Sequence, residues 1–362
     1  MALTLEPTQS IALPTPAEPI VALPTPSTMT GNYAELKQLI KSRGLLERTP
    51  LNYSLRIVSI CVMFAASIGI LVSVHLFWVQ MLNAVFLAFV STQFGFIGHD
   101  AGHRQIFAAT RNNDLVGLVT GNLISGMSFY WWLDKHNAHH AKPNEIDADP
   151  DISIPILAFT EDAARSRQGV ARFITKHQAS FFFPLLLFVA VDLQRSSIGF
   201  LRENKVKYPK IEGLFLVLHY IGYLGLTFAV LPIWQGVLFI VVHKLVSGLY
   251  LGSVFAPNHK GMLITESGSD MDFLPRQVLT ARNVKTGIFA DYWYGGLNYQ
   301  IEHHLFPTLP RRNLAAAQRI IRSYCEDHGL SYYETGAIQS YREIIAYLHE
   351  VSAPLRTTYA AA

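Results

Sequence analysis

Four long apolar segments constrain the fold of this chain more than any other feature. They are residues 57–78, 81–98, 212–231 and 233–257. A helix needs about 20 residues to cross the hydrocarbon core of a bilayer, which is about 30 Å thick. Half of the 362 residues are hydrophobic and only 15% are charged, which is few for a soluble domain. The sequence therefore predicts an all-α membrane protein with four transmembrane helices.

The composition divides the chain into three regions. Residues 1–32 are rich in Pro, Thr and Ala and lack the basic start and apolar run of a signal peptide, so they predict a disordered tail. Residues 33–345 form the predicted membrane domain, and residues 346–362 a C-terminal tail. Residues 33–48 have the pattern of an amphipathic helix with a basic face, which suits either an anionic membrane surface or an ordinary protein surface.

Histidine is the unusual residue of this chain, because eight of its 14 copies gather in clusters. The clusters are His99 and His103 in HDAGH, His136, His139 and His140 in HNAHH, His259 after Asn258, and His303 and His304 in QIEHH. Residues three and four apart share one face of a helix. Because a catalytic zinc takes about three protein ligands, eight imidazoles predict two metal ions. Imidazole suits Fe, Zn and Cu, so the ligands alone do not choose the metal.

The positions of the clusters predict the topology. Clusters that build one site must emerge on one side of the membrane, so the weaker apolar runs at 115–133 and 181–191 should not cross. Four spans in two hairpins follow, with a helical cap that holds the histidines. The far-side connections, predicted at 78–81 and 231–235, contain no Lys or Arg, whereas the other side is basic. Basic loops stay cytoplasmic, which predicts a multi-pass protein with its active site and both termini in the cytosol.

The order HDAGH, HNAHH and QIEHH, followed by LFPTLPRRN, resembles the membrane fatty-acid desaturases over roughly residues 50–340. It is similar to the branch whose third box opens with Gln, which includes front-end and some bacterial acyl desaturases. The resemblance implies a centre of two Fe ions with O2 as co-substrate, and no catalytic residue beyond the metal ligands. The ligands that it implies are His99, His103, His136, His139, His140, His259, His303 and His304.

Four other residues are candidates for roles around the metals. Gln300 stands where many relatives have His, and its amide can bind weakly, bind through water or orient a neighbour. Asp100 lies inside the first box and Asn258 precedes His259. Asp149 follows the second box in EIDADPDI, where a carboxylate either fixes a histidine tautomer or belongs to a solvated loop.

Aromatic and charged residues near the spans are weaker candidates. Trp131 and Trp132 precede the second box and Trp293 precedes the third, so they either line an acyl channel or anchor the protein at the membrane interface. His243 and Lys244 lie inside the last span, where a charge is costly and often functional.

The predicted function is the introduction of a cis double bond into an acyl chain carried by CoA or by a lipid. A hydroxylase, acetylenase or epoxidase on the same scaffold is the alternative, and a non-catalytic metal-binding membrane protein is a second. The sequence contains neither a His-Pro-Gly-Gly haem motif nor a nucleotide-binding glycine fingerprint, so we expect a separate ferredoxin or cytochrome b5 donor with its reductase. A net charge of +3 argues against nucleic acid and leaves membrane lipids as the other partner.

Overall fold

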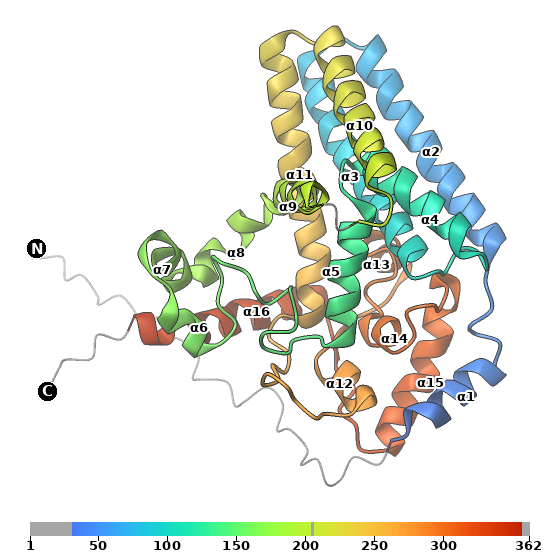
Figure 1. Ribbon diagram of the computed structural model, residues 1–362, viewed down its shortest axis with the longest axis vertical. Helices are drawn as coiled ribbons and strands as arrows, with labels where there is room; N and C mark the ends of the chain where they lie inside the picture. Colours follow the sequence, from blue (N-terminus) through green and yellow to red (C-terminus); the bar gives the residue numbers. More distant parts are fainter. Residues whose placement is uncertain (1–30, 204–205, 357–362) are drawn as a thin grey trace, which may run out of the picture.

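Four long helices form a bundle at one end of the molecule (Figure 1). The computed structural model describes residues 31–203 and 206–356. Within them, α2 (Pro50–Ser73), α3 (Phe77–Gly102), α10 (Pro209–Val230) and α11 (Ile233–His259) are long and apolar enough to cross a membrane. They form two hairpins whose turns lie at the same end of the bundle (Figure 1). The predicted four-helix membrane architecture is confirmed.

The first hairpin turns earlier than the sequence predicted. The connection is 74–76, where Val74 is extended, and Trp78 belongs to α3. The prediction at 78–81 was wrong because no Pro or Gly marks a turn in this apolar stretch. Pro232 marks the second hairpin, which turns where we predicted. Both α3 and α11 also extend beyond their apolar runs, and the extensions carry His99 and His259.

The weak apolar run at 115–133 does not form a membrane span. It folds into α4 (Thr110–Leu118), the π-helical segment η2 (Val119–Ser125) and the start of α5 (Phe129–Ala141). The carboxylate of Glu212, fully buried near the start of α10, accepts hydrogen bonds from Asn122 Nδ2 and the Tyr130 backbone N–H, both at 3.1 Å. These bonds fix the turn before α5, the helix that carries the second histidine cluster.

The weak run at 181–191 is broken into two helices. α8 (Gln178–Leu186) and α9 (Val189–Arg202) are bent by 73° relative to each other, the geometry of either a broken span or a re-entrant segment. The bend packs against α11 at Gly248, where a Cβ atom would lie 2.3 Å from the Leu187 carbonyl oxygen. A re-entrant segment is the arrangement that keeps all histidine clusters on one side.

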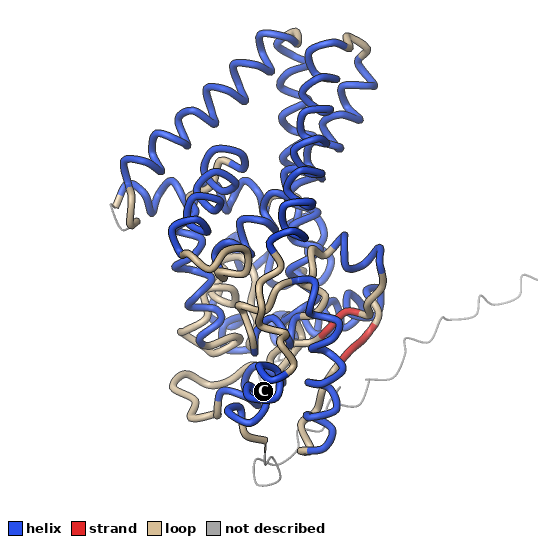
Figure 2. The backbone as a smooth tube through the Cα atoms, turned by 90° about the vertical axis from the view of Figure 1, so that its right-hand side faces the viewer, coloured by secondary structure: helices blue, strands red, loops and turns tan. Residues whose placement is uncertain are grey.

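Shorter elements gather at the other end of the molecule and form the cap (Figure 1). The helices are α1 (Tyr33–Ser42), α6 (Glu161–Ser166), α7 (Gly169–Lys176), α12 (Phe273–Leu279), α13 (Ile288–Trp293), α14 (Gln300–Leu305), α15 (Leu314–Asp327) and α16 (Ala337–Val351), with 3-10 turns η3 (Arg311–Asn313) and η4 (Ala353–Leu355). Figure 2 shows the short parallel pair of β1 (Asn283–Val284) and β2 (Glu334–Thr335). This pair is the only sheet in the described residues.

Both ends of the described chain belong to the cap. Leu36 and Ile40 of α1 are fully buried in a core shared with α15, so the apolar face of this helix is covered by protein rather than free to enter a membrane. Within the region predicted as a C-terminal tail, α16 continues to Val351, and Leu348 and Val351 are buried. Most of the predicted N-terminal tail, and residues 357–362, lie outside the described residues.

Candidate metal centre

All eight clustered histidines meet where the long helices enter the cap. His99 lies in the last turn of α3 and His103 directly follows that helix, while His259 is the last residue of α11. α5 contributes His136, His139 and His140, and α14 contributes His303 and His304. Each predicted box is therefore helical or ends a helix, and the four chain segments converge on one site.

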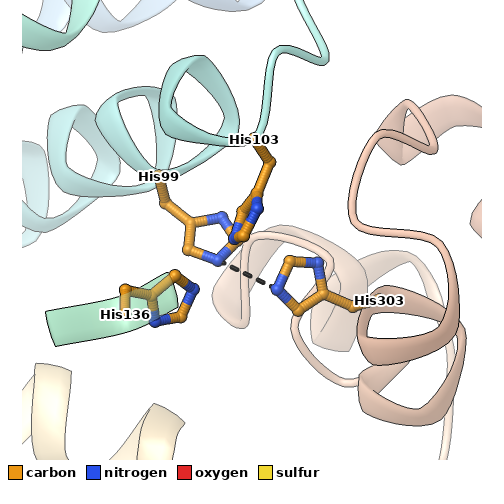
Figure 3. Close-up of side chains that lie close together, drawn as sticks. All are labelled: His99, His103, His136 and His303. Atoms are coloured by element: carbon orange, nitrogen blue, oxygen red, sulfur yellow. Dashed lines mark hydrogen bonds between the residues drawn. The ribbon is translucent and has the colours of Figure 1, made fainter. Parts of the chain in front are cut away.

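The first group consists of His99, His103, His136 and His303. One ring nitrogen from each lies within 4.8 Å of those of the others. Figure 3 shows the rings of three separate elements turned toward a common centre, and its dashed line joins His99 Nε2 and His303 Nε2 at 3.2 Å. Such an arrangement can hold one metal ion.

The second group consists of His139, His259 and His304, which also have ring nitrogens within 4.8 Å of one another. His259 Nε2 lies 3.3 Å from His139 Nε2 and 3.1 Å from His304 Nε2. Three imidazoles are the number of protein ligands that a catalytic metal site commonly has.

His140 lies between the two groups. Its ring stacks on His304 with centroids 4.1 Å apart, and its Nε2 is 3.1 Å from His136 Nε2. It therefore contacts both groups, and the structure brings together every histidine that the sequence predicted as a ligand.

The hydrogen bonds of the second group show which nitrogens carry protons. His259 Nδ1 is 2.9 Å from the Thr280 carbonyl oxygen, which can only accept, so this nitrogen is the protonated one. Gln277 donates its Nε2 to the His140 carbonyl oxygen at 3.0 Å, which turns its Oε1 toward His304 Nδ1 at 2.9 Å. His304 Nδ1 is therefore protonated as well.

The other ring nitrogens of His259 and His304, their Nε2 atoms, lie 3.1 Å apart, and both present lone pairs to the same space. Two lone pairs at this distance repel each other unless a cation lies between them. Burial, reinforced by neighbouring histidines, also lowers the pKa values of His136, His140, His303 and His304 well below the usual range. The rings are neutral near pH 7, the form in which imidazole binds a metal. The residues therefore fit a metal centre.

Two of the predicted carboxylates lie where they can orient ligands. Asp149 is buried, with both carboxylate oxygens 3.0 Å from His139 Nδ1. Asp100 Oδ1 is 3.2 Å from His99 Nδ1, and its other oxygen is paired with Arg311. A carboxylate behind a ligating histidine fixes the tautomer and ring orientation.

Gln300 lies against the second group. Its Nε2 is 2.8 Å from His259 Nε2, and its Oε1 accepts a hydrogen bond from Asn258 Nδ2 at 2.9 Å. The Oδ1 atom of Asn258 is buried without a hydrogen-bond partner among the described residues. Gln300 therefore borders the second group directly, and Asn258 contacts it through Gln300.

The three candidate tryptophans lie in different places. Trp132 stacks on His136, with ring centroids 4.5 Å apart, and also contacts His99. Trp293 instead packs on Tyr250 of α11, with centroids 4.2 Å apart. No ring contact joins Trp293 or Trp131 to the eight histidines within the described chain. Only Trp132 thus borders the centre directly.

The polar residues inside the last span lie apart from this centre. His243 contacts Tyr223 OH at 2.6 Å and Ser91 Oγ at 3.2 Å, which links α11 to α10 and α3. Lys244 Nζ lies 5.1 Å from the centre of the Tyr223 ring. These contacts satisfy the polar atoms of His243 within the bundle.

Sequence reasoning missed several residues that hold the histidines in place. They are Gln277 behind His304, the Thr280 carbonyl behind His259, Arg311 behind Asp100, and Asn144, which donates to the His259 carbonyl oxygen at 3.1 Å. None stands inside a box, and an isolated polar residue gives no signal of its own.

Comparisons with known proteins agree with this geometry. A family profile described as fatty acid desaturase matches residues 76–336, which include all eight histidines. This chain belongs to the fatty acid desaturase family. It is 32% identical over 339 residues to an acyl-lipid (9-3)-desaturase of Physcomitrium patens, and the match covers 91% of this chain and 64% of that protein.

Two further relatives cover a similar part of the chain. The match to a Delta(6)-fatty-acid desaturase of Caenorhabditis elegans is 30% identical and covers 84% of this chain and 71% of the relative. The match to a Delta(8)-fatty-acid desaturase of Euglena gracilis is 32% identical and covers 83% of this chain and 74% of the relative. The chain thus spans about two thirds to three quarters of the length of these three relatives.

Proposed function

We propose that this protein is an O2-dependent fatty-acyl desaturase that uses two iron ions to introduce a cis double bond into an acyl chain. The observation that carries the proposal is the pair of histidine groups whose Nε2 atoms converge, His259 and His304 foremost. Family membership and relatives named as desaturases support it. Bound iron would supply the oxidation of an unactivated C–H bond by O2, which no side chain can perform alone.

The residues of this chain would hold and orient that centre. His99, His103, His136 and His303 are the proposed ligands of one ion, and His139, His259 and His304 of the other, with His140 at the boundary. Asp100 and Asp149 would keep the ligand tautomers fixed. Trp132, stacked on His136, would form one wall beside the reacting acyl chain and exclude water.

The electrons for O2 reduction would come from a separate donor. Desaturation removes two hydrogens from the substrate, whereas reduction of O2 to two water molecules consumes four electrons, so two more must be supplied. A ferredoxin or cytochrome b5 donor with its reductase fits this need. Such a donor would dock near the histidine clusters on the cap.

The proposal is tested by expressing the chain in a host that lacks the activity and locating new double bonds by mass spectrometry of its fatty acids. We expect a new cis-unsaturated fatty acid that disappears when His303 is replaced by alanine. Hydroxylated or epoxidised acyl chains would instead show a sister reaction on the same scaffold. No new fatty acid at all, with a matching donor present, would contradict the proposal.

We also propose that the cap, with both termini, faces the cytosol. The hairpin turns at 74–76 and 231–232 contain no Lys or Arg, whereas the connection between α1 of the cap and α2, at 43–49, contains Arg43 and Arg48. Glycosylation acceptor sites inserted in the hairpin turns should be modified and sites in the cap should not. If a site near Asp149 were glycosylated and the sites in the turns were not, the cap would face away from the cytosol and the proposed orientation would be wrong.

A further inference from the structure

A basic cavity lies beside the metal centre, at the point where the cap meets α2. Its volume is about 160 Å³, and Arg56, Arg311, Arg312, Asp291 and Tyr299 are among the residues that line it. These residues come from α2, α13, the loop before α14, and η3. The motif LFPTLPRRN supplies two of the three arginines, and the proposed metal chemistry uses neither as a ligand.

Two of the three guanidinium groups have no acidic partner. Arg311 is paired with Asp100, and the carboxylate of Asp291 accepts hydrogen bonds from Asn298 Nδ2 at 2.8 Å and Tyr299 OH at 3.1 Å. Arg56 donates to Asn52 Oδ1 at 3.1 Å. Among the described residues, neither Arg56 nor Arg312 forms an ion pair. An arginine fork without a carboxylate is suited to bind a phosphate in a bidentate manner.

The helix that contributes Asp291 exposes apolar side chains. On α13, Ile288 is 94% exposed and Phe289 is 79% exposed. Phe289 stacks on Trp293 of the same helix, with ring centroids 6.0 Å apart, and Trp293 in turn contacts Phe89, which lies ten residues before His99 in α3. At about 1.5 Å per residue this is roughly 15 Å from the histidine, within the membrane part of the helix. The exposed side chains therefore lie where the cap meets the membrane part of the bundle, beside the basic cavity.

An apolar surface next to unpaired arginines fits a molecule with acyl chains and an anionic head. We propose that this cavity binds the phosphate of a glycerophospholipid, and that this lipid presents its acyl chain to the metal centre. The inference rests on the proposed desaturase function and names the acyl carrier for it. A phosphate fits within 160 Å³, whereas the nucleotide part of CoA would remain outside the cavity.

The position of Arg311 connects this cavity to the centre. Arg311 lines the cavity, and its guanidinium pairs with Asp100, whose other oxygen contacts His99 Nδ1 at 3.2 Å. A lipid phosphate held by Arg56 and Arg312 would therefore lie close to the ligands of the first histidine group. This proximity would hold the ester end of the acyl chain near the metals.

The test compares the full-length protein with Arg56→Gln, Arg312→Gln and the double variant, each reconstituted with its electron donor. Arg319→Gln is the matched control, because Arg319 is an exposed arginine of α15 that does not line the cavity. The same fatty acid is offered in phosphatidylcholine vesicles, in vesicles of a phosphate-free galactolipid, and as a CoA thioester. Phospholipid phosphorus that remains with the detergent-purified protein is measured in parallel and needs no enzyme activity.

For phosphatidylcholine we expect KM to rise about tenfold for each arginine removed, because one charge-assisted contact is lost each time, with kcat little changed. Arg56→Lys and Arg312→Lys should restore part of the loss, and Arg319→Gln should behave as the unchanged protein. The double variant should also lose its bound phospholipid. The galactolipid reaction should not respond to either arginine.

Three results would overturn the inference. One is an unchanged KM for phosphatidylcholine together with unchanged bound phosphorus. Another is an equal rise of KM for the galactolipid, since the arginines would then act on structure rather than on phosphate. The third is a rise confined to the CoA thioester, which would assign the cavity to the phosphates of CoA. An unchanged protein that is inactive on every carrier would count against the desaturase function, while the phosphorus measurement would still decide the lipid site.

Discussion

Replacement of His259 by alanine is expected to lower the metal content from about two iron ions per chain to about one and to reduce desaturation to background. His259 belongs to the group of three imidazoles, and its loss would leave His139 and His304. Two imidazoles fall short of the about three protein ligands of a typical catalytic site. Metal analysis of purified protein, together with fatty-acid profiling at matched expression, checks both parts.

His349→Ala is the control for this experiment, because His349 is exposed on α16 and stands outside the clusters. The control should keep about two iron ions and full activity. A His259→Ala protein that kept its iron and its activity would show that this histidine is not a ligand. Active unchanged protein with stoichiometric zinc and no iron would contradict the choice of metal.

The membrane architecture was predictable because each of its signals is local. The length of an apolar run identifies a span, and the spacing of His136, His139 and His140 places three imidazoles near one face of a helix. The same local rule failed at the first hairpin, where residues 70–94 continue through the turn without Gly or Pro. Pro232 made the second hairpin predictable, since proline favours the start of a helix.

Some of the residues that orient the histidines could be predicted from the sequence, and others could not. Asp149 could be proposed because it follows the second box closely, and the structure places it on His139 Nδ1. Gln277 and Arg311 could not, because they reach the site through the folding of the cap. Their roles depend on contacts between segments that are distant in the sequence, and a single sequence carries no record of such contacts.

The ends of the cap show the same limit. The apolar face of α1 was visible in the sequence, but only the structure shows that Leu36 and Ile40 pack on α15 rather than on lipid. The boundary predicted at residue 345 cut α16, because the short C-terminal pattern gave no apolar run of its own. An amphipathic pattern predicts a buried face and does not identify what buries it.

Substitutions of Gln300 are expected to separate a ligand-like role from simple packing. With a cation on His259 Nε2, the atom favoured on Gln300 at 2.8 Å is an oxygen rather than an N–H group. Half a turn of both amides would exchange the two atoms of Gln300 and bring Asn258 Oδ1, which has no partner among the described residues, to accept from Gln300 Nε2. Gln300 would then contribute its carbonyl oxygen to the second metal position.

Gln300→His should therefore retain measurable desaturation, because an imidazole offers a lone pair from a similar place. Gln300→Ala should lose about 10–100-fold in activity, the usual cost of removing a group that supports a metal ligand. His303→Ala should fall to background, because a member of the first histidine group is lost. The measurement is fatty-acid profiling and iron content of the three variants at matched expression. If Gln300→His is as inactive as His303→Ala while Gln300→Ala stays active, Gln300 only fills space beside His259.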